Sequence, residues 1–307
     1  GPAGLSAATF LKRLGYDVDL FESESFSGGV LTWGIPAYRL PKRIVRQEAK
    51  FIESLGVRIH VAHPIDNPLA LLQEYKAVFI STGTNRPHRL GLPGEQLSGV
   101  LQALDLLKEV NSALIEHRDF DLPLGNQVLV IGGGNAAMDA AVTARKLGAS
   151  HVSILYRRSE DAMPAWEEEK KFALSKSVAI QPLTGPVRFL EKDGRLSGLE
   201  CIKMRLGEID ASGRKRPIPL EGSEFQIACD TAIVAISQGP SGGLEGLERE
   251  PSGLVRVDQE TLATSALGIY AGGDLIRGSD MAVRAVGDGK RAAFAIDAWI
   301  QESIQKT

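Results

Sequence analysis

The sequence has 307 residues, of which 43% are hydrophobic, and this length is typical of about two domains with sizeable cores. A net charge of −3 argues against nucleic acid or an anionic membrane as partner, and two cysteines, Cys201 and Cys229, exclude a disulfide framework or a cysteine cluster for iron or zinc. Five scattered histidines argue against a metal site. No run reaches the roughly 18 apolar residues of a membrane helix, and no signal peptide is visible. We therefore expect a cytoplasmic α/β protein.

The first segment, GPAGLSAATFLKRLGY, predicts a glycine turn that leads straight into a helix. The strand and the first glycine of such a turn are not in the sequence, and we expect them to lie upstream. The following residues predict a strand over 18–23, a helix around 41–54 and short strands at VRIHV and AVFIST. This βαβ order is typical of a mostly parallel sheet.

A second unit follows a Pro/Gly-rich connector at 86–99 and the helix-like segment LQALDLLKEVNSALIEH. It begins with strand QVLVI at 127, the turn GGGNAA, the helix MDAAVTARKLGA and the strand HVSILY. A charged helix is expected at roughly 164–175. Alternating stretches such as LSGLECIKMRL predict antiparallel strands, and TAIVAIS closes the unit near residue 237.

The last part of the chain resumes with LVRV, then GIYAGGD, then a helix from about 280 to 301. Strand GIYA is too isolated to form a domain and fits as the final strand of the first unit's sheet. We therefore predict an α/β fold of two Rossmann-like dinucleotide-binding domains, one inserted into the other. The outer domain is expected at 1–95 and 238–307, and the inserted domain at 96–237.

The turn GGGNAA supplies a complete dinucleotide-binding pattern. In G-x-G-x-x-G/A the first glycine makes the bend, the second lets the backbone approach the pyrophosphate, and the third position lets the helix pack on the strand. Gly132, Gly134 and Ala137 fit these positions, and Asn135 and Ala136 lie between them. The strand before and the helix after favour a ligand site, with the N–H groups of the helix facing the phosphates.

Two arginines follow the next strand, where an NAD site would carry an acid for the ribose 2′-OH. Arg157 and Arg158 suit a 2′-phosphate, which guanidinium groups bind in bidentate fashion. The alternative is that both are solvated loop arginines, and Glu160 and Asp161 nearby count in its favour. The position at the strand end favours NADPH over NADH.

The opening turn belongs to the type in which an acid, rather than arginines, follows the next strand. Gly1 and Gly4 fit the second and third glycines, and Glu22 ends the next strand, where a carboxylate would hold an adenosine ribose. Alone, Glu22 could be an ordinary exposed acid. One turn with an acid and one with arginines predict two different dinucleotides.

Several longer motifs occur in order along nearly the whole chain: ESFSGGVLTWGIPAYRLP, STGTNRP, VIGGGNAAMDAA with YRR, and GIYAGGDLIRGSDMAVRAVGDGKRAA. In these motifs the sequence resembles the glutamate synthase small-subunit group, and it is similar to the N-terminal flavin–NADPH portion of dihydropyrimidine dehydrogenase. The resemblance implies FAD in the outer domain and NADPH in the inserted one.

The resemblance also assigns roles to single positions. Gly1, Gly4 and Glu22 would serve the adenosine diphosphate part of FAD. Further FAD-binding positions that it implies are Gly28, Gly29, Thr82, Gly83, Gly273, Asp274, Met281 and Ala282. Asp274 would bond the ribityl-phosphate region, and the helix that starts at Met281 and Ala282 would point its N-terminus at the flavin ring, where the helix dipole stabilises negative charge.

The implied reaction is hydride transfer from NADPH to FAD, followed by electron transfer to an iron–sulfur domain or subunit outside this sequence. The cofactors carry the chemistry, so no catalytic side chain and no metal ligand is expected. Two alternatives from the same class are a thioredoxin-reductase-like or a ferredoxin–NADP-linked flavoprotein. The former needs a C-x-x-C pair, whereas Cys201 and Cys229 lie 28 positions apart in apolar strand-like stretches and are expected to be buried and inert. A non-enzymatic alternative is a nucleotide-binding redox sensor or a structural subunit.

Overall fold

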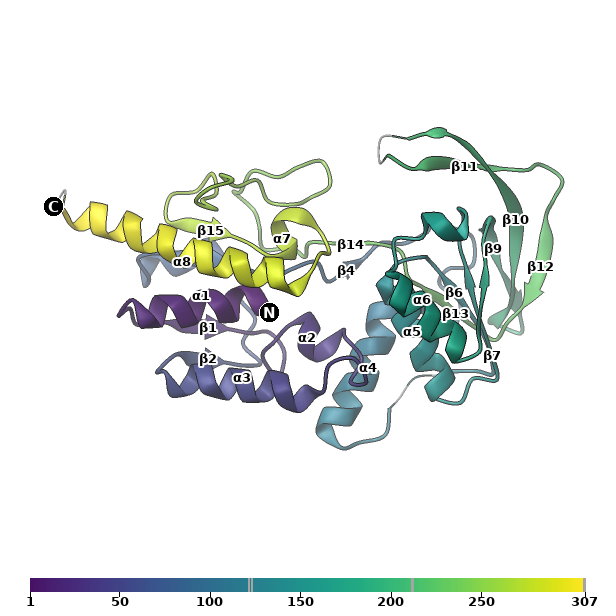
Figure 1. The fold of residues 1–307 in the computed structure, drawn as a ribbon, viewed down its shortest axis with the longest axis horizontal. Coiled ribbons are helices and arrows are strands. Elements are labelled where there is room, and N and C mark those ends of the chain that lie inside the picture. The colour runs from purple at the N-terminus through teal and green to yellow at the C-terminus, as the bar shows by residue number, and fades with distance from the viewer. Residues whose placement is uncertain (121, 123, 211–212, 306–307) are drawn as a thin grey trace. The chain divides into compact units, whose positions relative to one another are not determined.

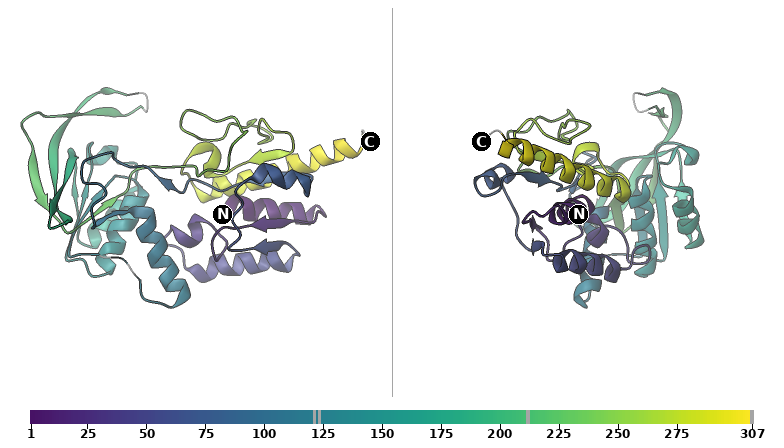
Figure 2. Two further views of the ribbon diagram at one scale, coloured as in Figure 1. Left: turned by 180° about the vertical axis from the view of Figure 1, so that it is seen from behind. Right: turned by 60° about the vertical axis from the view of Figure 1, so that its left-hand side comes forward.

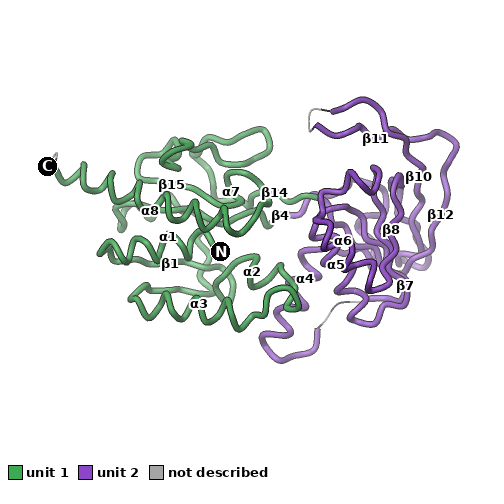
Figure 3. The backbone as a smooth tube through the Cα atoms, viewed as in Figure 1, with its two compact units in different colours: residues 1–86, 237–307 green, residues 87–236 purple. Residues whose placement is uncertain are grey.

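The computed structural model describes residues 1–305 except 121, 123, 211 and 212. The chain divides into two compact units, residues 1–86 with 237–307 and residues 87–236 (Figure 3). One α/β unit is thus inserted into another, and the chain passes between them twice. The expected divisions were at 95/96 and 237/238. The first lies nearer 86/87 because Leu90, Leu92 and Leu97 pack on the core of the inserted unit.

Unit 1 contains short parallel strand pairs and helices that cover them (Figure 1). Strand β1 pairs with β2, with Asp19 opposite Arg58, and β15 pairs with β3, with Ile269 opposite Val78. The elements are α1 (Pro2–Arg13), β1 (Asp19–Phe21), α2 (Val30–Trp33), α3 (Lys42–Ser54), β2 (Arg58–His60), η1 (Pro68–Gln73), β3 (Val78–Ile80), β15 (Ile269–Ala271), α7 (Asp274–Arg277) and α8 (Ala282–Gln305). At the two chain passages, β4 (Arg86–Pro87) pairs with β14 (Gln238–Gly239).

Helices α1 and α8 lie side by side, as the views of Figures 1 and 2 show. Their close approach needs Gly289, because a Cβ atom there would lie 2.1 Å from the backbone oxygen of Ala3. The small side chains of α1 allow the same contact, since Ala3 and Ala7 are buried. This packing fixes the first turn of α1 beside the loops that follow β15.

Unit 2 is built on a parallel sheet with strand order β5-β13-β6-β7-β8 and an antiparallel group in which β10 pairs with β9, β11 and β12. The elements are β5 (Val100–Gln102), α4 (Ala103–Glu116), β6 (Gln127–Ile131), α5 (Asn135–Lys146), β7 (His151–Leu155), η2 (Glu160–Ala162), α6 (Glu167–Ser175), β8 (Val178–Gln181), β9 (Thr184–Lys192), β10 (Arg195–Ile209), β11 (Lys215–Pro219), β12 (Phe225–Ala228) and β13 (Thr231–Val234). The continuous apolar runs in β6 and β13 follow from burial on both faces.

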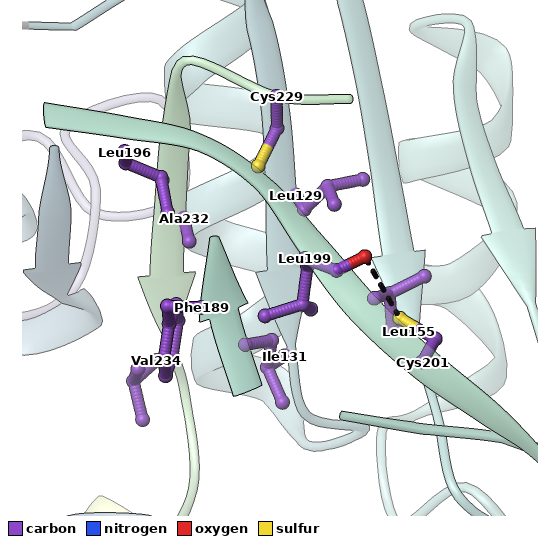
Figure 4. Packing of buried hydrophobic residues seen from close by; sticks show 10 residues of the cluster. All are labelled: Leu129, Ile131, Leu155, Phe189, Leu196, Leu199, Cys201, Cys229, Ala232 and Val234. Atoms are coloured by element: carbon purple, nitrogen blue, oxygen red, sulfur yellow. Dashed lines mark hydrogen bonds between the residues drawn. The ribbon is translucent and has the colours of Figure 1, made fainter. Parts of the chain in front are cut away.

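The core between the parallel sheet and the antiparallel strands includes both cysteines (Figure 4). The Sγ of Cys201 lies 3.9 Å from the backbone oxygen of Leu199. Burial raises the pKa of Cys201 and of Cys229 to about 12, so neither thiol ionises near neutral pH. The expectation of buried, inert cysteines is confirmed.

Most expected elements are present, with two corrections. The charged helix begins at Glu167 rather than near 164, because residues before it lie across the glycine turn, where Ala165 N donates to Gly133 O at 3.0 Å. In LVRV, Val255 makes only an isolated bridge with Arg249. GIYA forms β15 of unit 1, as expected. Among the described residues, no helix has the length and apolar character needed to cross a membrane.

Candidate dinucleotide sites

The first turn of α1 packs directly against the turn that starts α2. Gly1 precedes α1, and Gly29 precedes α2 with φ of 56°. A Cβ atom on Gly29 would lie 2.7 Å from the Cα of Gly1, closer than real Cβ atoms approach. Gly28 is also left-handed, with φ of 118°, and a Cβ there would meet Thr32 Oγ1 at 2.2 Å. Glycine is therefore required at both positions, and two N–H-bearing helix starts lie together.

Glu22 lies at the same place. Its backbone N donates to His60 O at 2.9 Å, which continues the β1–β2 pairing by one residue. Its carboxylate accepts a hydrogen bond from Glu24 N at 3.1 Å, and Oε2 lies 4.0 Å from the Gly1 nitrogen. The structure thus brings Gly1, Glu22 and Gly29 together, although up to 28 positions separate them in the sequence.

The turn after β3 approaches the other side of α1. A Cβ on Gly4 would lie 2.8 Å from Ser81 Oγ, so the helix packs closely on the end of β3. Thr82 is exposed, and Gly83 has φ of 72° with open space beside it. The next residue, Thr84, is buried, and its Oγ1 lies 3.3 Å from Ser279 Oγ. This contact joins the turn after β3 to the loop between α7 and α8.

The loop after β15 is held by a buried carboxylate that sequence reasoning missed. Asp288 on α8 is 2% exposed and accepts hydrogen bonds from Gly273 N at 2.9 Å, from Arg291 at 2.8 Å and from Arg277. Burial opposes its ionisation, but the arginines and the Gly273 N–H lower the pKa of Asp288. Gly273 has φ of 69°, and a Cβ there would lie 3.2 Å from Ala3 Cβ. The motif GDGKR contained this signal, an acid followed three residues later by an arginine on one helix.

Asp274 has the opposite electrostatic environment. It is the first residue of α7. Burial, together with the nearby charge of Asp280, raises the pKa of Asp274 to about 6. A hydrogen bond from Asp280 N and the charge of Arg277 favour the ionised form, but they offset burial only in part. Helix α8 starts at Ala282, and the residues around this start are solvent-exposed, including Met281 just before it at 39% and Val283 at 69%. An incompletely compensated acid beside exposed apolar residues at a helix start is typical of a binding site.

The glycine turn of unit 2 has three distinct local environments. A Cβ on Gly132 would lie 2.2 Å from Ala235 O, and one on Gly133 would lie 2.4 Å from the ring of Tyr156. Gly134, which precedes α5, has nothing within 4 Å of its Cβ position. Ala137 is fully buried. The bend, the open approach and the helix packing thus occur at the three positions where a dinucleotide turn needs them.

The remaining expected residues of this turn lie close by. Asn135 Oδ1 accepts a hydrogen bond from Trp166 N at 3.0 Å, which holds the segment before α6 across the turn. Ala136 is exposed at the start of α5. Gly133 was not among the expected positions, although the ring of Tyr156 requires it.

The two arginines after β7 differ. Arg157 is exposed and makes no hydrogen bond or ion pair with the part of the chain that the structure describes. Arg158 is 4% exposed, and its guanidinium donates to Asp210 Oδ2 at 2.7 Å and to Lys215 O at 2.8 Å. That Arg157 and Arg158 bind a 2′-phosphate stays a prediction, and in this structure the guanidinium of Arg158 is paired with Asp210.

Comparison with known proteins identifies the family. Residues 1–289 match the family described as pyridine nucleotide-disulphide oxidoreductase. The chain belongs to this family. FAD and NADPH, the cofactors expected from the sequence, agree with this membership, as does the expected class of NADPH-dependent oxidoreductase.

Similar proteins include several subunits of larger enzymes. The chain is 39% identical, over 98% of its length, to the NADP(+)-dependent formate dehydrogenase subunit beta of Moorella thermoacetica, of which it spans 43%. It is 34% identical, over 98% of its length, to the glutamate synthase [NADPH] small chain of Escherichia coli, of which it spans 67%. The resemblance to the small-subunit group is thereby confirmed. The chain spans about half the length or less of some of its relatives, including 49% of the NADPH-Fe(3+) oxidoreductase subunit beta of Geobacter sulfurreducens.

Two solved structures confirm the fold class. FprA from Mycobacterium tuberculosis in complex with NADPH matches with a TM-score of 0.83 at 17% identity, covering 100% of this chain and 84% of FprA. Thioredoxin reductase from Lactococcus lactis matches with a TM-score of 0.75 at 20% identity, covering 98% of this chain and 97% of the reductase. The predicted architecture of two Rossmann-like domains, one inserted into the other, is confirmed.

Proposed function

We propose that unit 1 binds FAD, that unit 2 binds NADPH, and that the chain passes electrons from NADPH through FAD to an iron–sulfur domain or partner subunit. The observation that carries this proposal is the presence of two different glycine turns in one chain. One has the carboxylate of Glu22 at the end of the next strand, and the other has the exposed guanidinium of Arg157 there. When bound, the cofactors supply hydride and single-electron transfer, and the protein supplies binding, orientation and electrostatics.

In unit 1 the proposed FAD site consists of the expected residues that the fold gathers around α1. Gly1, Gly4 and Glu22 would face the adenosine diphosphate part, with Gly28 and Gly29 beside them. The close contact between Gly29 and Gly1 supports this, because side chains at that place would cover the first N–H groups of α1.

The other end of the proposed site consists of Thr82, Gly83, Gly273, Asp274 and the start of α8. The N-terminus of a long helix stabilises negative charge. Helix α8 starts at Ala282, close to Asp280, whose backbone N donates to Asp274, and this supports a role for Met281 and Ala282 in the site. Gly273 donates its N–H to the buried carboxylate of Asp288, which supports a loop that is held in place by α8. A site built in this way orients a ring without moving.

In unit 2 the proposed NADPH site is the turn at Gly132, Gly134, Asn135, Ala136 and Ala137. The open space at Gly134 supports it, because the backbone there can approach a pyrophosphate. The N–H groups of α5 would then face the phosphates.

The proposed acceptor follows from the relatives. Those above are named as subunits of a glutamate synthase, a formate dehydrogenase and an Fe(3+) oxidoreductase, which supports transfer to a partner domain or subunit. The buried Cys201 and Cys229 argue against a dithiol relay of the thioredoxin-reductase type. The iron–sulfur nature of the acceptor and a cytoplasmic location stay predictions.

The test is an anaerobic titration of the FAD-reconstituted chain with NADPH and then with NADH, in which flavin absorbance is followed. We expect bleaching by NADPH at a concentration at least tenfold lower than that of NADH. Arg157→Ala should bring the two values within a few-fold, whereas Arg256→Ala, which removes an exposed arginine from unit 1, should leave both unchanged. Failure of either nucleotide to bleach bound flavin would refute the reductase, and nucleotide binding without flavin uptake would favour a sensor or structural module.

A further inference from the structure

An open hollow on the surface of unit 1 is lined mainly by arginines. Its volume is about 440 Å³, and its lining consists of Arg277, Arg284, Gly287, Asp288 and Arg291. Arg277 ends α7, and the other four residues belong to the first three turns of α8. Because these four are spaced by three and four positions, they lie on one face of the helix.

The floor of the hollow is a glycine that packing does not require. Gly287 lies inside α8, where glycine is less favourable than alanine. A Cβ atom on Gly287 would have nothing within 4 Å, whereas one on Gly289 would lie 2.1 Å from Ala3 O. The contact with α1 therefore explains Gly289 but not Gly287. A side chain at Gly287 would occupy the hollow, so the glycine keeps it open, and an unpacked glycine inside a helix usually has a functional reason.

The guanidinium groups around this floor keep donors for a further acceptor. Arg277 and Arg291 donate to the buried carboxylate of Asp288, and Arg291 also donates to a backbone oxygen at 3.0 Å. Arg284 donates to Asp280 at 3.0 Å. A guanidinium has five N–H groups, and contacts with the described residues use at most two of them in each of these arginines.

The arginines differ in how firmly they are held. The pair of Arg277 with Asp288 involves a carboxylate that is 2% exposed, and such a pair is costly to break. Arg284 is 60% exposed, and its pair with Asp280 is of the surface kind that contributes little. An arriving carboxylate can therefore take the place of Asp280. The lining carries three positive charges and one negative charge, in a chain whose net charge is −3.

We propose that this hollow, together with the exposed Val283 one turn before Gly287, is the docking site for a carboxylate-bearing segment of the electron-accepting partner. Arginine binds carboxylate in bidentate fashion and is enriched at protein interfaces. The electron-accepting role of the partner rests on the proposed function. Helix α7 starts with Asp274 and α8 with Ala282, so both helices that form the hollow begin in the proposed FAD site.

The first test measures binding of a fluorescein-labelled hexaglutamate peptide to the full chain by anisotropy, at about 20 mM salt, where surface charges are weakly screened. Arg284→Gln, which removes the exposed charge, and Gly287→Leu, which fills the hollow without changing charge, should each weaken binding by about tenfold. Gly287→Leu should leave the melting temperature equal or higher, because leucine is the better helix former and the space is open. No binding by the wild type, or equal binding by Gly287→Leu, would overturn the site.

Lys50→Gln is the matched control for charge. Lys50 is exposed on α3, which lies on the other side of α1 from α8 (Figures 1 and 2). This variant should bind the peptide within about twofold of wild type. A loss equal to that of Arg284→Gln would show a general charge effect and overturn the local site.

Succinate distinguishes a docked protein segment from a free small acid. A single dicarboxylate engages fewer groups than a peptide, so we expect displacement of the peptide only at a concentration about a hundredfold above that of unlabelled hexaglutamate. Equal potency of succinate and hexaglutamate would refute a docking site and favour a small-molecule site.

The second test examines the electron-accepting role with an acidic [2Fe–2S] ferredoxin as the probe, mixed in its reduced form with the FAD-reconstituted chain. Two ferredoxins give one electron each, and the flavin takes up protons from water. At low salt Arg284→Gln should slow this transfer by about tenfold and Lys50→Gln by less than twofold. Equal rates in wild type and Arg284→Gln, or no transfer in either, would overturn the assignment of the partner.

The peptide assay uses neither cofactor, so its failure is separate from failure of the proposed function. If NADPH bleaches bound flavin but hexaglutamate does not bind, the docking site alone is overturned. If hexaglutamate binds at the hollow but no nucleotide bleaches flavin, the proposed function is refuted, and with it the electron-accepting role of the partner.

Discussion

Replacing Asp274 with asparagine is expected to stabilise the folded protein, although Asp274 lies in the proposed FAD site. Burial raises its pKa to about 6, against an ordinary value of 3.8. Above pH 6 the carboxylate is ionised in both the folded and the unfolded chain, and the folded state carries the full free-energy cost of burying this charge. Below about pH 4 it is protonated in both, and the penalty is absent. Asparagine has nearly the same shape and no charge.

The magnitude follows from the size of the shift. A shift of about two pKa units corresponds to about 3 kcal/mol, and because the side chain keeps some contact with water we expect about 1.5 kcal/mol. Asp274→Asn should therefore raise the melting temperature at pH 8 by about 3 to 6 °C and leave it unchanged near pH 4. The same variant should bind FAD about tenfold more weakly, since a neutral acceptor then replaces a charged one.

The assay is thermal unfolding at pH 4, 6 and 8, together with a fluorescence titration of the apoprotein with FAD. Asp258→Asn is the matched control. Hydrogen bonds from the Thr261 N–H and hydroxyl and from the Glu260 N–H lower the pKa of Asp258, so this variant should lose stability at pH 8. A lower melting temperature for Asp274→Asn at pH 8 would refute the electrostatic reasoning, and unchanged FAD affinity would refute its place in the site.

Three further outcomes are expected. Gly29→Ala should lower the free energy of unfolding by about 2 kcal/mol and abolish FAD uptake, because the new Cβ meets the Gly1 backbone and φ is 56°. Gly15→Ala, at φ of 95° in open space, should lower it by only about 1 kcal/mol and keep FAD. The measurement is the flavin that each purified variant retains, and equal retention in both would contradict this reasoning. Asp288→Asn should lower the free energy of unfolding by about 3 kcal/mol at pH 7, as measured by denaturant unfolding. Because the pKa of Asp288 is lowered in the folded chain, the difference from wild type should shrink as the pH falls below about 4. A pH-independent difference would argue against an ionised Asp288. Cys201 and Cys229 should react with a thiol reagent only after unfolding, since burial raises both pKa values to about 12; fast labelling of the native chain would contradict the burial.

The amino-acid sequence alone determined the elements and the glycine turns. The strand–turn–helix around Gly132 and Gly134, the antiparallel segments and the long last helix depend on patterns within one short window, where local backbone preference and hydrophobic periodicity decide the outcome. The insertion of one unit into the other also followed, because an isolated strand GIYA needs a sheet, and it forms β15 beside β3.

Tertiary structure decided which side chains face each other across distant segments. Three contacts join positions that no local pattern connects. They are the ion pair of Arg158 with Asp210, the ion pair of Asp288 with Arg277, and the close approach of Gly29 to Gly1. The same holds for the first domain boundary, which follows the leucines of the connector onto the core of unit 2. A side chain's burial, charge partners and pKa depend on the low-dielectric surroundings that packing creates, and these exist only after the segments have come together.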